Sequence, residues 1–150
     1  MDHHTLAMVV ISFIVGYMST MNLWVVNIND ARWHLNDVYM VTLMVGWMML
    51  LMFLFLKSPS NSKCGIVISI LVIILALYLI RTQTLINDKQ FLNGMIPHHS
   101  MAILMANQIK DKTNDFRIKQ LANNIINSQT REIKLMTKIL AETNDNQFIL

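Results

Sequence analysis

Residues Val38 to Leu56 read VYMVTLMVGWMMLLMFLFL and contain no charged side chain. A helix of this length crosses the roughly 30 Å hydrocarbon core of a bilayer. Leu6–Val26 is likewise uncharged and long enough, and Cys64–Ile80 is shorter but almost wholly aliphatic. Backbone groups in lipid must be paired within the chain, so isolated spans form helices. The sequence therefore predicts three transmembrane helices and a lipid bilayer as partner.

The composition agrees with a membrane protein. Of the 150 residues, 54% are hydrophobic and only 14% are charged, whereas about a quarter of the residues in a soluble domain are charged. The net charge of +3 is modest, and the basic residues do not form the clusters that bind nucleic acid. We therefore expect no nucleic-acid partner.

The character of the chain changes after Arg81, where acids and bases become frequent and mixed in sign. Apolar residues then recur at helical spacing within residues 88–112 and 114–141, and the turn DKTND separates the two runs. Asn114 is the expected N-cap of the second helix. We predict an all-α chain, with a three-span anchor in residues 1–81 and an antiparallel helical hairpin in residues 82–150.

A lone hairpin buries too little apolar surface to be stable. It is expected to pack on the membrane helices, on a second copy, or on both. Pairing two hairpins into a four-helix bundle is the simplest arrangement, so a homo-oligomer is predicted.

The first polar helix carries a group of candidate metal ligands. The segment Phe91–Ala106 reads FLNGMIPHHSMAILMA, and its imidazole and thioether groups are Met95, His98, His99, Met101 and Met105. Four of them lie at i, i+3 and i, i+4 intervals along one stripe, and His99 flanks it. Imidazole together with thioether sulfur favours copper(I) or silver over ions that prefer oxygen.

Two further features concern the same stripe. Pro97 removes a backbone N–H inside the predicted helix, so a kink is expected beside the histidines. On the second helix, Gln129, Glu132 and Met136 share a face that could meet the stripe. Glu132 is expected to hold an imidazole N–H. The same pattern also fits core methionines and histidines that are satisfied by hydrogen bonds.

FLNGMIPHHSMAILMA, followed by QTREIKLM at Gln129–Met136, resembles the signature of the bacterial domain-of-unknown-function family 305. The resemblance covers Asp88–Leu140 most clearly, and the methionine-rich spans upstream are also similar to those of membrane-anchored members. It implies a ferritin-like helical bundle that binds copper or silver outside the cytoplasm. The chain departs from the family pattern at Leu92, where relatives often have methionine, and in ending after one hairpin.

Carried onto this sequence, the resemblance implies one metal site, with copper(I) or silver held by Met95, His98, His99, Met101, Met105 and Met136. It also implies a bacterial inner-membrane protein with an extracytoplasmic hairpin. The distribution of lysine and arginine among the loops leaves the topology undecided.

The membrane spans carry methionines of their own. Met40, Met44, Met48 and Met52 form an i, i+4 ridge in the second span with Met49 beside it. This ridge is expected either to relay a soft ion or simply to fill helix contacts. The spans contain no charged residue, which argues against active transport.

The leading hypothesis is a membrane-anchored binder of copper(I) or silver that acts in metal tolerance, buffering or delivery. The alternative is a structural or accessory subunit of a membrane complex without a metal. No enzyme is expected, because paired Glu-x-x-His motifs and a nucleophile with its base are lacking from the sequence.

Overall fold

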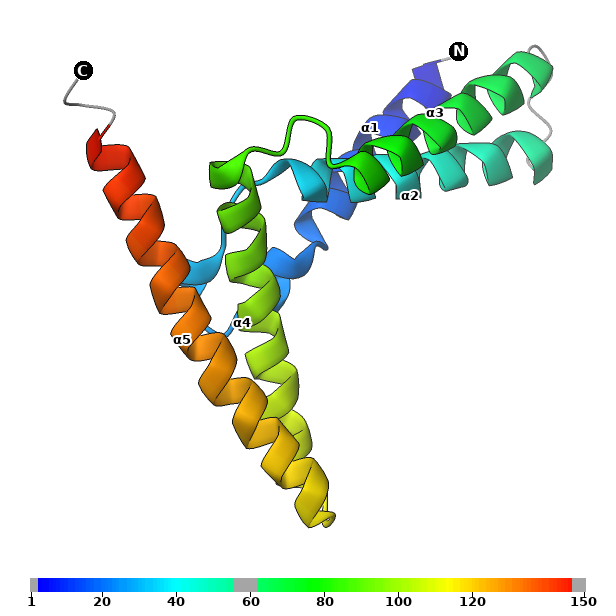
Figure 1. Ribbon diagram of the computed structural model, residues 1–150. Coiled ribbons are helices and arrows are strands. Elements are labelled where there is room, and N and C mark those ends of the chain that lie inside the picture. Colours follow the sequence, from blue (N-terminus) through cyan, green and yellow to red (C-terminus); the bar gives the residue numbers. More distant parts are fainter. Residues whose placement is uncertain (1–2, 56–61, 147–150) are drawn as a thin grey trace. The chain divides into compact units, whose positions relative to one another are not determined.

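The computed structural model describes residues 3–55 and 62–146, and every regular element within these two stretches is a helix (Figure 1). The elements are α1 (His3–Met18), the short 3-10 helices η1 (Met21–Trp24) and η2 (Ile28–Asp30), α2 (Leu35–Phe55), α3 (Ser62–Thr82), α4 (Asp88–Lys112) and α5 (Phe116–Asn146). The all-α prediction is confirmed for this part of the chain.

Three helical segments are long and apolar enough to cross a membrane: Thr5–Trp24, Leu35–Phe55 and Lys63–Thr82. Many of their large apolar side chains point outward, and Ile11 and Leu71 are each 59% exposed. Such a surface suits lipid better than water. Leu56, the last residue of the predicted second span, and residues 57–61 lie outside the described residues.

The sequence predicted that the first span continues as a helix to Val26. In the structure it is not one continuous α-helix. The helix α1 ends at Met18, and the Ser19 hydroxyl then donates to the Val15 carbonyl at 2.8 Å. Serine competes in this way for backbone acceptors and so favours helix ends. The chain continues as the 3-10 turn η1.

The chain divides into two compact units. One comprises Met1–Thr20 and Leu35–Ile86, and the other comprises Met21–His34 and Asn87–Leu150. The helices α4 and α5 thus share their unit with residues 21–34, which lie between α1 and α2.

In the first unit, α2 and α3 run antiparallel. A Cβ on Gly46 would lie 2.9 Å from a side-chain carbon of Ile73, and one on Gly65 would lie 2.6 Å from the Phe53 ring. Glycine therefore allows the two backbones to approach closely at both levels, as small residues do between membrane helices. Val45 and Ala76 are buried in the same unit.

The chain leaves α3 through a left-handed turn. Gln83 and Leu85 have φ angles of 51° and 63°, which non-glycine residues rarely adopt. The Gln83 amide donates to the Ile80 carbonyl at 2.7 Å and to the Asn36 side chain at 3.1 Å. The Tyr39 hydroxyl also donates to the Thr84 carbonyl at 2.6 Å. These bonds hold the strained turn against the start of α2.

In the second unit, α4 and α5 run antiparallel and pack against each other (Figure 1). Ile96, Met136 and Leu140 are its buried cluster. The N-cap of α5 is Asp115 rather than the predicted Asn114. The Asp115 carboxylate accepts from the Arg117 backbone N–H at 2.8 Å, and the helix begins at Phe116.

The segment Met21–His34 is tied to α4 by a buried serine. The Val26 backbone N–H donates to the Ser100 hydroxyl oxygen at 2.9 Å, and that hydroxyl donates to the Asp30 carboxylate at 2.8 Å. Ser100 itself is fully buried. The imidazole of His34 lies over Gly94, where an added Cβ would come within 3.4 Å of the ring.

Candidate functional site

Both histidines lie in the middle of the length of α4 rather than at its start. It runs without interruption from Asp88 to Lys112 and includes Pro97. Asn87 caps its first turn, because its side chain accepts from the Gln90 backbone N–H at 2.9 Å. The capped first turns fix the helix axis before the chain reaches Pro97, so the orientations of His98 and His99 follow helical geometry.

His99 faces the hairpin interior and is held through both ring nitrogens. Its Nδ1–H donates to the Met95 carbonyl at 2.7 Å, and its Nε2 lies 2.7 Å from the Glu132 carboxylate. The side chain of His99 is only 9% exposed. Both ring nitrogens thus face a hydrogen-bond acceptor, a carbonyl on one side and a carboxylate on the other. A metal ion at Nε2 would have to displace the Glu132 carboxylate.

The carboxylate that holds His99 comes from α5, as the sequence predicted for Glu132. Ser128 donates to its other oxygen at 2.8 Å. The hydrogen bonds from Ser128 and His99 lower the pKa of Glu132, and the nearby charges of His99 and Arg131 act in the same direction. The acid is therefore ionised at neutral pH, and it joins α4 to α5 through a charge-assisted bond.

His98 lies on a different side of α4 from His99 and is exposed. Its ring centroid lies 6.0 Å from that of His99, and the ring planes meet at 69°. Met101 and Met105 follow His98 at three and seven residues, so they share its side of the helix. Met101 is partly buried and Met105 is 62% exposed.

The two remaining predicted ligands lie in the core. Met136 is buried with Ile96 and Leu140, and Met95 packs against this cluster. Their sulfurs contribute to the packing of α4 on α5, which is the ordinary use of methionine in an irregular interior.

The six predicted ligands thus fall into two groups. The inner group is Met95, His99 and Met136, and the outer group is His98, Met101 and Met105. Over the residues that the structure describes, no three His, Cys, Asp or Glu side chains gather where they could hold a metal ion. A metal site on α4 would therefore depend on thioether sulfur.

Met105 also lines an apolar groove between the two helices near their connecting turn. The groove has a volume of about 490 Å³. The other lining residues are Ala102, Ala106, Ile109, Ile118, Leu121, Ala122 and Ile125. Most belong to the apolar faces that the sequence pattern predicted, and here part of those faces is open.

Two contacts of α4 were missing from the sequence-based site. Ser100 binds the segment Met21–His34, and Gly94 makes room for His34. Neither Gly94 nor Ser100 belongs to a periodic sequence pattern that would predict these contacts. Only tertiary structure brings residues so distant in sequence to the helix.

These features define a class of protein: a helical hairpin with a His/Met helix, joined to three helices apolar enough to span a membrane. Residues 79–145 match the family model described as domain of unknown function (DUF305). The chain is also 56% identical over 138 residues to an uncharacterized protein of Acanthamoeba polyphaga mimivirus, and the match covers 91% of each chain. The protein belongs to the DUF305 family. No solved structure matches it.

Proposed function

We propose that the protein is a membrane-anchored binder of copper(I) or silver that acts in metal tolerance, buffering or delivery. The observation that carries this proposal is the outer side of α4, where the exposed His98 stands in helical register with Met101 and Met105. An accessible imidazole and two thioethers form a donor set suited to a soft ion.

The inner group holds further candidate ligands. Nε2 of His99 would be open to a metal once Glu132 moves away, since that carboxylate now lies 2.7 Å from it. Glu132 is 48% exposed at its side chain, so it has room to move. His98 and His99 are neighbours in sequence, which lets one ion engage both after a local rotation.

A titration of the full-length protein in detergent with copper(I), under a competing chelator, tests this function. We expect the double variant His98→Ala and His99→Ala to bind at least about tenfold more weakly, a loss of about 1.4 kcal/mol. The matched control is His3→Ala with His4→Ala at the N-terminus, which should leave the affinity unchanged. Equal affinity of the hairpin variant and the wild type would refute the assignment.

We further propose that two hairpins pair along the apolar groove and complete a four-helix bundle. Leu121 is 59% exposed and Ile109 is 44% exposed there, and a second copy would cover both. Pairing would also bring two Met105 side chains together, so each chain could donate sulfur to the other's site. Mass measurement in detergent should give a dimer for the wild type and a monomer for Leu121→Glu. A monomeric wild type would contradict the pairing.

A second function has support of its own. Met95 and Met136 pack in the core and both ring nitrogens of His99 are hydrogen-bonded, as expected if these side chains have a structural role. The protein would then serve as an accessory subunit of a membrane complex. This alternative predicts a stable partner in affinity purification and no copper in the isolated protein.

The compartment belongs to the proposal as well. The family resemblance suggests a bacterial inner membrane with the hairpin outside the cytoplasm, whereas the similar protein described above is viral. The function proposed here requires a membrane anchor and does not depend on which of these membranes it enters.

A further inference from the structure

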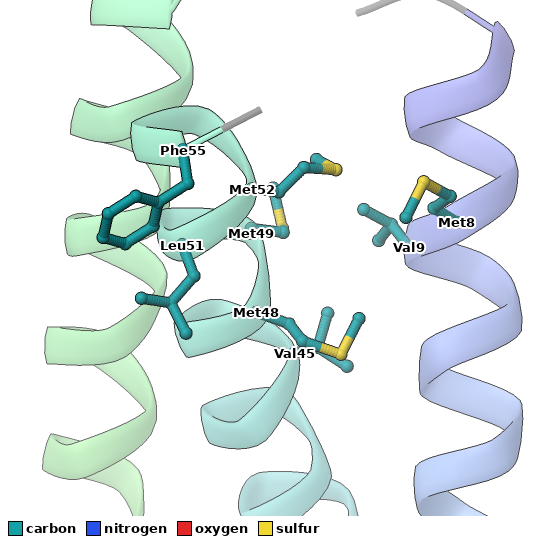
Figure 2. A pocket seen from close by; sticks show the side chains of 8 residues that line it. All are labelled: Met8, Val9, Val45, Met48, Met49, Leu51, Met52 and Phe55. Carbon is teal, nitrogen blue, oxygen red and sulfur yellow. The ribbon is translucent and has the colours of Figure 1, made fainter. Parts of the chain in front are cut away.

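The first unit, which holds α1, α2 and α3, contains a cavity with four methionines in its lining. It lies between α1 and α2, has a volume of about 310 Å³, and its lining includes Met8, Met48, Met49 and Met52. Met8 projects from α1 toward α2, and Met48 and Met52 project from α2 toward α1 (Figure 2). Half of the eight lining residues are therefore methionines.

The cavity results from the way in which α1 packs on α2. Gly16 is buried, and a Cβ there would collide with the terminal methyl group of Met44 and lie 3.1 Å from Val41. The helices are therefore in close contact at this level. Met8 lies about two turns nearer the start of α1 than Gly16, and it faces Met48 and Met52 across the cavity. Four methionines line the space where the close contact ends.

The chemistry of the lining selects a class of ligand. No charged side chain lines the cavity, so a doubly charged ion would remain uncompensated in a medium of low dielectric constant. Thioether sulfur binds soft ions and is a poor ligand for magnesium or calcium. Among metal ions, the remaining candidates for this cavity are singly charged soft ions.

The position of the cavity lowers the cost of holding a charge there. Met8 lies less than two turns after the start of α1 at His3, and Met52 lies within a turn of the end of α2 at Phe55. The penalty for a charge is greatest at the bilayer centre and falls near the interface. An ion can thus reach the sulfurs without crossing the middle of the membrane.

We propose that this cavity is a second metal site, which binds copper(I) or silver(I) through the thioether sulfurs of Met8, Met48, Met49 and Met52. The cavity is larger than a single ion, but methionine has an unbranched side chain with three rotatable bonds and can close around one. The site shares no residue with the hairpin site, and it stands whether or not the hairpin binds metal.

Silver titration of the full-length protein in lipid nanodiscs tests the proposal. We expect a variant with leucine at Met8, Met48, Met49 and Met52 to bind one ion fewer per chain than the wild type, because leucine keeps the apolar volume but lacks the sulfur. The matched control is Met18→Leu with Met40→Leu, which removes membrane methionines outside the cavity lining. Unchanged stoichiometry and affinity in the four-leucine variant would overturn the site and leave the cavity to packing or a lipid chain.

A second variant separates this proposal from the hairpin function. With His98→Ala, His99→Ala, Met101→Leu and Met105→Leu, the hairpin site is removed while the cavity is intact. This variant should still bind silver, and X-ray absorption should show sulfur neighbours around the ion. Failure to bind silver would contradict the cavity site even if the four-leucine variant did not fold. If the four-leucine variant binds one ion fewer than the wild type and the hairpin variant binds as many ions as the wild type, the hairpin site is refuted and the cavity site stands.

Discussion

At the scale of single residues, Asp115 determines where the second hairpin helix begins. Its carboxylate accepts from the Arg117 backbone N–H and also pairs with the Arg117 guanidinium at 2.7 Å. The hydrogen bonds from Arg117 lower the pKa of Asp115 below its ordinary value. Its contribution to stability is therefore complete above the unfolded-state pKa of Asp115 and is lost as pH falls through the lower folded-state value.

We predict that Asp115→Ala frays the first turn of α5 at neutral pH. Amide hydrogen exchange at Arg117 should be faster in the variant than in the wild type at the same pH, because the capping acceptor is gone. The difference should shrink once the pH is low enough to protonate the wild-type carboxyl. A difference that stayed constant from neutral to strongly acidic pH would show that charge on Asp115 does not support the cap.

The residues of the candidate site were easier to name than to place. Imidazole and thioether groups are visible in the sequence, and the partnership of Glu132 with an imidazole followed from helical spacing. The separation of His98 from His99 follows from helical geometry, because α4 continues through Pro97 and adjacent helical residues point about 100° apart.

At the scale of elements, the segment Met21–His34 is held to α4 by Ser100, which contacts both Val26 and Asp30. The serine is fully buried, and so its removal would leave two polar groups without their partner. Such a loss costs about 1–3 kcal/mol.

We therefore predict that Ser100→Ala loosens this segment while α4 and α5 stay paired. The Val26 amide should exchange with solvent markedly faster, and amides in the middle of α5 should be unaffected. Thr137→Ala on the exposed side of α5 serves as the control and should change neither. Unaltered exchange at Val26 in the serine variant would mean that the bond contributes nothing to docking of the segment.

The extent of the elements was largely predictable. Charge-free runs gave α2 and α3 to within a few residues, and amphipathic spacing gave α4. The first span was the exception, because hydropathy alone does not register that Ser19 and its neighbours end α1 at Met18. The packing of residues 21–34 with the hairpin depends on contacts between distant parts of the chain, which no local pattern encodes.

The sulfur-lined cavity shows the same limit. The ridge of Met44, Met48 and Met52 was evident from i, i+4 spacing, but Met8 was not grouped with it. The antiparallel pairing of two consecutive helices places Met8 opposite Met48 and Met52. In an antiparallel pair, residues that are equally far in sequence from the α1–α2 connection lie opposite each other. Counting residues from that connection would have grouped Met8 with Met48 and Met52.

At the scale of the whole molecule, three spans require the α2–α3 connection and the α4–α5 turn to face opposite sides of the membrane. We predict that a cysteine at Lys63 and a cysteine at Lys112, each in a Cys64→Ala background, react with an impermeant maleimide from opposite sides of sealed vesicles. Both positions are exposed. Labelling of both from the same side would contradict the three-span anchor.

We propose above that the protein binds copper(I) or silver on α4. The most direct test is the copper content of the full-length protein purified from copper-supplemented cells, compared with that of His98→Ala combined with His99→Ala. We predict bound copper in the wild type and clearly less in the double variant. A wild type without copper, or equal copper in both proteins, would contradict it.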